Sequence, residues 1–105
     1  MKAGALIMSL TLIVGVAACG GAPNTFRVKA DRNVASAELR LCGKNKHLQR
    51  LGDSFVGAQI VTCEGGGVIV IRSENRPTTC ILGYVTPGAP QDFSFVVEDG
   101  ICRPA

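Results

Sequence analysis

The side chains best suited to nucleophilic or general-base chemistry at neutral pH are few in this sequence: five cysteines and one histidine in 105 residues. The histidine, His47, lies in a basic stretch that runs from Lys44 to Arg50. A general-base histidine needs a nucleophile and an orienting carboxylate beside it, and the sequence around His47 presents no recognisable set of this kind. We therefore expect a protein that is not an enzyme, with His47 in a solvated loop or at a strand edge.

The N-terminal segment, residues 1–18, has the pattern of an export signal. Lys2 supplies a positive start, an uncharged and largely apolar run follows from Ala3, and the small residues Ala17 and Ala18 end the segment. An uncleaved anchor that spans the membrane needs about 20 apolar residues, and the glycines and Pro23 that follow the apolar run disfavour this alternative.

The end of this segment, Val16-Ala17-Ala18-Cys19, resembles the lipobox of bacterial lipoprotein precursors, in which an aliphatic residue and two small residues precede an obligatory cysteine. The resemblance covers only the start of the chain. It implies a diacylglycerol thioether on Cys19, cleavage just before Cys19 and acylation of the new amino group, so that the lipid bilayer is a partner. Gly20 after the cysteine then implies the outer membrane of the bacterial envelope rather than the inner. Ordinary cleavage after Ala18, which gives a plainly secreted small β protein, remains the alternative.

This interpretation divides the chain into a signal peptide (1–18), a lipidated cysteine with a flexible tether (19–25) and a single β domain (26–105). One acyl chain gives only marginal membrane binding, whereas two or more anchor a protein stably. The β domain therefore needs no apolar membrane face of its own.

The other four cysteines, Cys42, Cys63, Cys80 and Cys102, are widely spaced. Zinc sites use closely spaced ligand pairs with histidine partners, which this spacing does not provide, so we expect no metal and no cofactor. In a small exported chain these cysteines should form disulfides. Four cysteines allow three connectivities, and we favour sequential pairing, Cys42 with Cys63 and Cys80 with Cys102, because it suits a meander of strands.

The elements that must position these residues are strands. Polar and apolar residues alternate with a period of two in segments 26–31, 36–41 and 93–97. A continuous apolar run at 68–71 suits a central strand, and segments 55–61 and 79–85 complete about six strands. Turn residues separate them at 43–46, 52–53, 65–67, 73–77 and 87–90. The pattern predicts an all-β fold, a small antiparallel β-sandwich or barrel stapled by disulfides.

The charge is modest: 11 Lys and Arg against 8 Asp and Glu give a net charge of +3, which does not argue for nucleic acid as a partner. The basic stretch nevertheless holds candidate binding residues, Lys44, Lys46, His47 and Arg50, for an anionic surface or an envelope protein. Its alternative is a solvated loop that keeps the domain soluble.

Tyr84 is a further candidate, either as the aromatic anchor of an exposed loop or, the reading we favour, as a buried strand residue. Taken together, the sequence predicts a small membrane-anchored bacterial envelope lipoprotein with a non-enzymatic binding or structural role. The alternative is a periplasmic or surface inhibitor of a lysozyme or protease, for which segment 87–91 would be the contact loop.

Overall fold

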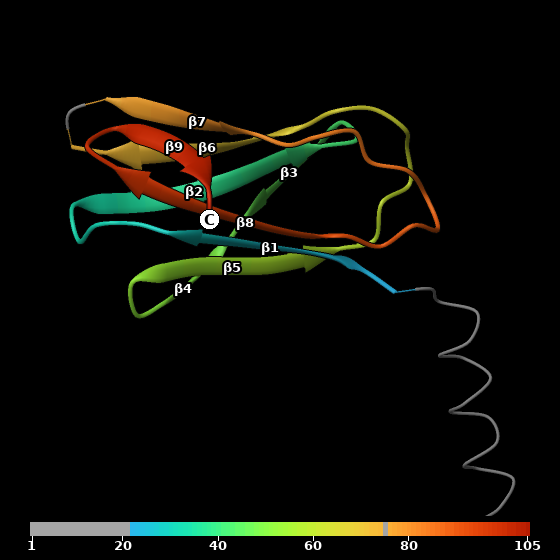
Figure 1. The fold of residues 1–105 in the computed structure, drawn as a ribbon, viewed down its shortest axis with the longest axis horizontal. Coiled ribbons are helices and arrows are strands. Elements are labelled where there is room, and N and C mark those ends of the chain that lie inside the picture. The colour runs from blue at the N-terminus through green and yellow to red at the C-terminus, as the bar shows by residue number, and fades with distance from the viewer. Residues whose placement is uncertain (1–21, 75) are drawn as a thin grey trace, which may run out of the picture.

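The computed structural model describes residues 22–74 and 76–105. These residues form nine strands and no helix, arranged as two sheets of order β4-β5-β1-β8-β9 and β3-β2-β6-β7 (Figure 1). The strands are β1 (Asn24–Lys29), β2 (Val34–Leu41), β3 (Lys44–His47), β4 (Gln49–Leu51), β5 (Ser54–Gln59), β6 (Val68–Ser73), β7 (Pro77–Ile81), β8 (Asp92–Glu98) and β9 (Ile101–Pro104).

The two sheets face each other across one apolar core. In β1 the side chains of Phe26 and Val28 are buried while those of Arg27 and Lys29 are exposed, as the alternation predicts. The same pattern buries the apolar side chains of β2, and β6 contributes buried isoleucines from the centre of the second sheet. The Phe26 ring stacks on that of Phe93, with 5.5 Å between centroids, and this contact ties β1 to β8 within the core.

The predicted all-β class is confirmed, but the structure has more strands than expected and one parallel pair. β3, β4 and β9 were not predicted, because their side chains are mostly exposed and show no period of two. The expected strands 55–61 and 79–85 end earlier, at Gln59 and Ile81. β1 also starts at Asn24, so that Asn24 and Thr25 belong to the sheet, and β1 pairs with β8 in parallel.

The turn expected at 43–46 is shorter than predicted. Cys42 and Gly43 alone connect β2 to β3, and both have positive φ, 57° and 71°. Positive φ at both central residues is the signature of a type I′ turn, whose twist matches that of the strands it joins. Lys44 therefore pairs directly with Leu41, and the rest of the basic stretch is drawn into the sheet.

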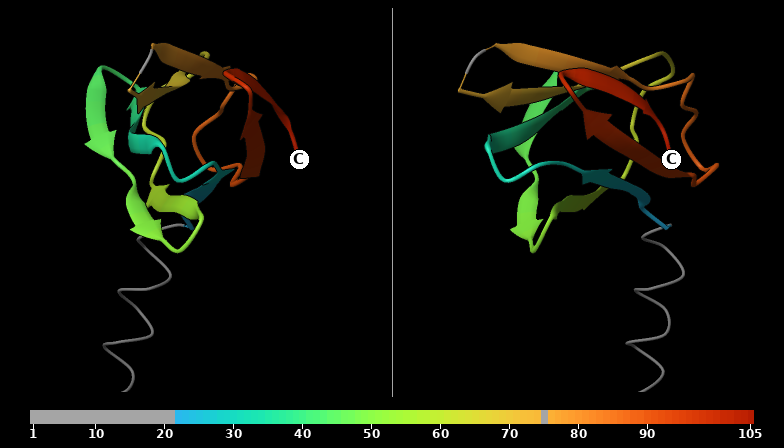
Figure 2. Two further views of the ribbon diagram at one scale, coloured as in Figure 1. Left: turned by 90° about the vertical axis from the view of Figure 1, so that its left-hand side faces the viewer. Right: turned by 60° about the vertical axis from the view of Figure 1, so that its left-hand side comes forward.

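The two long sides of the sandwich are closed in different ways (Figure 2). On one side the chain itself passes from one sheet to the other, as β3 pairs with β2 and β4 pairs with β5. Leu48 lies at this crossing, buried in the core, with its N–H donating to the carbonyl of Ala37. On the other side no ladder of described residues joins β7 to β9, and the disulfide between Cys80 and Cys102 connects them.

Both disulfides have the predicted sequential pairing. Cys42 is bonded to Cys63 and Cys80 to Cys102, with Cα–Cα distances of 5.5 Å and 5.3 Å, within the usual range for disulfides. The first bond ties the β2–β3 turn to the long β5–β6 loop. Together the two bonds fasten one end and one side of the sandwich.

The two disulfides should differ in their contribution to stability. They close loops of similar length, 21 and 22 residues, so constraint of the unfolded chain contributes about 3 kcal/mol in each case. Cys80 is only 1% exposed and its bond closes an open side, so replacing Cys80 and Cys102 together by Ala should destabilise the domain more than replacing Cys42 and Cys63. Urea unfolding of the two oxidised double variants measures this difference. An equal fall in the free energy of unfolding in both variants, or a larger fall in the Cys42 and Cys63 variant, would contradict this prediction.

Gly67 should be intolerant of a side chain. A Cβ there would lie 2.7 Å from Cδ1 of Leu41 and 2.8 Å from the carbonyl oxygen of Arg40, and the latter is a backbone atom that cannot rotate away. We expect Gly67→Ala to destabilise the domain by about 1–3 kcal/mol. Gly83→Ala is the matched control, because a Cβ there meets no atom within 4 Å, and its effect should stay within about 0.5 kcal/mol. Urea unfolding of both variants tests this difference. Similar urea midpoints for the two variants would contradict the close contact of position 67 with Leu41 and Arg40.

Candidate functional site

A cluster of charged side chains lies on the outer face of the β3-β2-β6-β7 sheet. Glu38 and Arg40 point outward from β2, because the alternating residues Ala37, Leu39 and Leu41 point into the core. The register places His47 of β3 directly opposite Glu38. We call Glu38, Arg40, His47 and Arg72 of β6 the sheet-face cluster.

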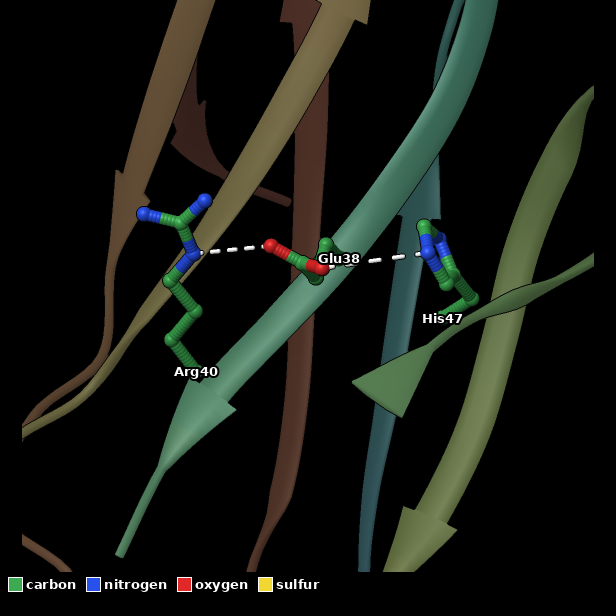
Figure 3. Close-up of polar contacts among 3 residues, drawn as sticks. All are labelled: Glu38, Arg40 and His47. Atoms are coloured by element: carbon green, nitrogen blue, oxygen red, sulfur yellow. Dashed lines mark hydrogen bonds and ion pairs between the residues drawn. The ribbon is translucent and has the colours of Figure 1, made fainter. Parts of the chain in front are cut away.

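Glu38 is at the centre of this cluster (Figure 3). The Nε–H of Arg40 donates a hydrogen bond to Oε1 of Glu38 at 2.8 Å. The Nε2 of His47 lies 3.8 Å from Oε2, which is too long for a hydrogen bond but close enough for attraction when the imidazole is protonated. The Glu38 side chain is 16% exposed and that of His47 is 74% exposed, so the carboxylate lies between its two partners while the histidine faces solvent.

These contacts keep Glu38 ionised. The hydrogen bond from Arg40 is the largest cause that lowers the pKa of Glu38 below its ordinary value of 4.5; partial burial opposes it, and the charges of Arg40, His47 and Arg72 add to it. A general acid at neutral pH needs a raised pKa, so Glu38 is unsuited to that role. The sheet-face cluster is better suited to contacting charged groups than to transferring protons.

The predicted basic residues do not form one patch. The Nζ of Lys46 donates to the carbonyl of Ala58 on β5, across the side where the chain changes sheets. Arg50 donates from Nη1 to the carbonyl of Val34 at 2.6 Å, and its guanidinium lies 5.0 Å from the ring centroid of Phe55. Lys46 and Arg50 therefore brace the two sheets, whereas Lys44 and His47 remain exposed on β3.

Tyr84 is exposed, and the expectation that it is buried was wrong. Because β7 ends at Ile81, Tyr84 lies in the connection to β8, where 63% of the residue is exposed. Its hydroxyl donates a hydrogen bond to Oε1 of Glu64 at 3.1 Å. Cys19, the predicted lipid attachment residue, lies outside the described residues.

A shallow depression of about 430 Å³ beside the end of β1 is lined by several charged residues. Its charges are balanced: Lys29 lies 3.9 Å from Asp53, Arg103 contacts Glu98, and Asp31 and Arg32 add one charge of each sign. It therefore presents no field of a single sign. Among the described residues, no group of three or more His, Cys, Asp or Glu side chains is placed to hold a metal ion, and no helix is long and apolar enough to span a membrane.

Segment 86–91, which includes the predicted contact loop of an inhibitor, is exposed and fixed at both ends. Just before the segment, Val85 and Gly65 exchange two backbone hydrogen bonds, and at its end the N–H of Thr25 donates to the carbonyl of Gln91. The segment contains no aromatic residue and no arginine, the residue types that most often dominate binding energy at protein interfaces. Its composition therefore favours a connecting role over that of an inhibitory loop.

Sequence reasoning placed Arg40 beside the basic stretch but missed the contribution of Glu38 and Arg72 to the site. The alternation in β2 already placed Glu38 and Arg40 on the solvent face. The missing information was the pairing of β2 with β3, because a stretch of four exposed polar residues gives no apolar period from which a strand could be predicted.

The pH dependence of Glu38 tests the geometry of the sheet-face cluster. Because folding lowers its pKa, ionised Glu38 stabilises the fold above pH 4.5, and this contribution is lost as the pH falls below 4.5 and through the lowered pKa. Arg40→Met removes the largest cause and should raise the pKa of Glu38 towards 4.5, whereas His47→Gln should raise it less. An NMR titration of the Glu38 carboxyl carbon in the wild type, Arg40→Met and His47→Gln ranks the pKa of Glu38 in the three proteins. A larger rise in His47→Gln than in Arg40→Met would contradict the arrangement.

We compared the chain with models of known protein families, with curated proteins and with solved structures, and found no match in any of the three.

Proposed function

We propose that this chain is a lipid-anchored protein of a bacterial envelope, held in the outer membrane through acylated Cys19, whose β domain binds an envelope component without catalysing a reaction. The observation that supports it best is the position of the first strand. β1 begins at Asn24, whose side chain is buried, only a few residues after the cysteine of the lipobox-like sequence.

The short connection between Cys19 and Asn24 limits how far the domain can move from the membrane. An extended chain spans at most about 3.6 Å per residue, so the Cα atoms of Cys19 and Asn24 can be no more than roughly 18 Å apart. An acylated Cys19 would therefore hold the β domain beside the bilayer. The two disulfides agree with this location, because they persist in oxidising compartments such as the bacterial periplasm.

The sheet-face cluster is the surface that we assign to binding. It lies on a sheet whose strands are fixed by the core and by both disulfides, so its side chains are presented on a rigid support. Glu38 already accepts from Arg40, which leaves positive charge in excess when Arg72 is counted. An envelope component that carries negative charge fits this surface best.

Replacing Cys19 tests the proposal. Only a thiol can form the thioether, so Cys19→Ser should abolish acylation and move the chain from the membrane fraction to the soluble fraction. The matched control is Ser9→Ala, which changes a residue within the export signal and should leave fractionation unchanged. Fractionation of cells that express the three proteins, followed by non-reducing electrophoresis, measures location and disulfide formation together. A wild-type chain that is soluble like Cys19→Ser would refute the proposal and support plain secretion.

A further inference from the structure

The two ends of the sandwich differ in charge. β1 starts at the end of the sandwich where the loops at 60–67 and 81–91 gather (Figure 1). The uncharged β2–β3 turn, Cys42 and Gly43, lies at the same end, where Cys42 is bonded to Cys63 and Lys44 is the first residue of β3. We call this the anchor end. In these two loops the only charged residue is Glu64, and its carboxylate accepts a hydrogen bond from Tyr84.

The opposite end is built from the short turns at 30–33, 52–53 and 99–100, together with Glu74 and Arg76 between β6 and β7 (Figure 1). Every one of these turns carries at least one charged residue; they are Asp31, Arg32, Asp53, Glu74, Arg76 and Asp99. Charged turns are what a surface in contact with water normally shows. The anchor end departs from that pattern although it contains the longest loops of the described residues.

The anchor end also exposes large apolar side chains. Three large apolar residues here are each at least half exposed: Ile60, Ile81 and Tyr84. Ile60 follows β5, Ile81 is the last residue of β7, and Tyr84 lies three residues after it. Exposed Leu51 and Ile101 lie at the opposite end, next to the charged turns. Tyr84 combines an apolar ring with a hydroxyl that needs a polar partner, which is the property of residues enriched where a membrane meets water.

We propose that the anchor end lies against the bilayer in which the acyl chains of Cys19 are inserted, with Ile60, Ile81 and Tyr84 in the headgroup region. This inference rests on the proposed lipid anchor. The acyl chains supply the affinity, and the short tether keeps the anchor end at a high local concentration near the lipid surface, so weak apolar contacts suffice to orient the domain. The strands then rise away from the membrane, and the sheet-face cluster faces sideways, open to a neighbouring component of the envelope.

The absence of tryptophan from the sequence allows a direct test with single-tryptophan variants. We would place Tyr84→Trp at the anchor end and Ile101→Trp at the opposite end, since Tyr84 and Ile101 are similarly exposed, at 63% and 66%. Ile81→Trp is a second probe of the anchor end. The full lipidated proteins are reconstituted in vesicles of phosphatidylethanolamine and phosphatidylglycerol, with or without bromine on the acyl chains, and quenching of tryptophan fluorescence is measured.

Quenching in Tyr84→Trp and Ile81→Trp should exceed that in Ile101→Trp roughly threefold or more, because a strand length of about 20 Å separates the two ends. Equal quenching at both ends, in protein whose mass shows the acyl chains, would overturn this inference and leave the lipid anchor standing. Purified protein whose mass shows no acyl chains would overturn both the lipid anchor and the contact of the anchor end with the bilayer. Tryptophan at position 84 that is shielded in native envelope membranes but not quenched in protein-free vesicles would mean that a protein covers the anchor end, which also overturns contact with lipid.

Discussion

The bond between Cys80 and Cys102 is the contact on which the closed shape of the domain depends. One side of the sandwich is closed by backbone, because the chain crosses between the sheets at Leu48 and pairs with a strand of each. On the other side, no hydrogen-bonded ladder of described residues joins β7 to β9, and the disulfide holds these two strands together. The Thr78 hydroxyl adds one hydrogen bond across this side, to the carbonyl of Gly100. A domain of this size buries a limited apolar core, so such cross-links supply a large share of its stability.

The closed sandwich determines what each polar residue can do. Where the chain crosses between the sheets, Lys46 and Arg50 donate to backbone carbonyls of the opposite sheet, and their charge serves the fold. On the outer face of the second sheet, the pairing of β2 with β3 brings Glu38 between Arg40 and His47 and lowers the pKa of Glu38. The same basic stretch thus contains two residues that brace the sheets, Lys46 and Arg50, and two that face the solvent, Lys44 and His47. Only their positions in the paired strands separate the two roles.

Much of the fold could be predicted from the sequence where a physical pattern is local. Alternation in segments 26–31 and 36–41 gave the buried faces of β1 and β2 correctly. The sequential disulfides were also predicted correctly, but the meander from which they were expected is not the observed strand order, and Cys80 and Cys102 link strands of different sheets. The parallel pairing of β1 with β8 depends on contacts far apart in the chain and has no local signal. β3 was missed because edge strands with exposed side chains lack an apolar period. The exposure of Tyr84 followed from where β7 stops, which the apolar run around it concealed.

The account joins a rigid β domain to a membrane through one residue, Cys19, so the chemical state of that residue is its central claim. The most direct measurement is the intact mass of the chain extracted from membranes, under non-reducing conditions. The account predicts a chain that begins at Cys19, carries the mass of the added acyl groups and lacks four hydrogens because of the two disulfides. A chain that begins at Cys19 or later without added acyl mass would contradict it.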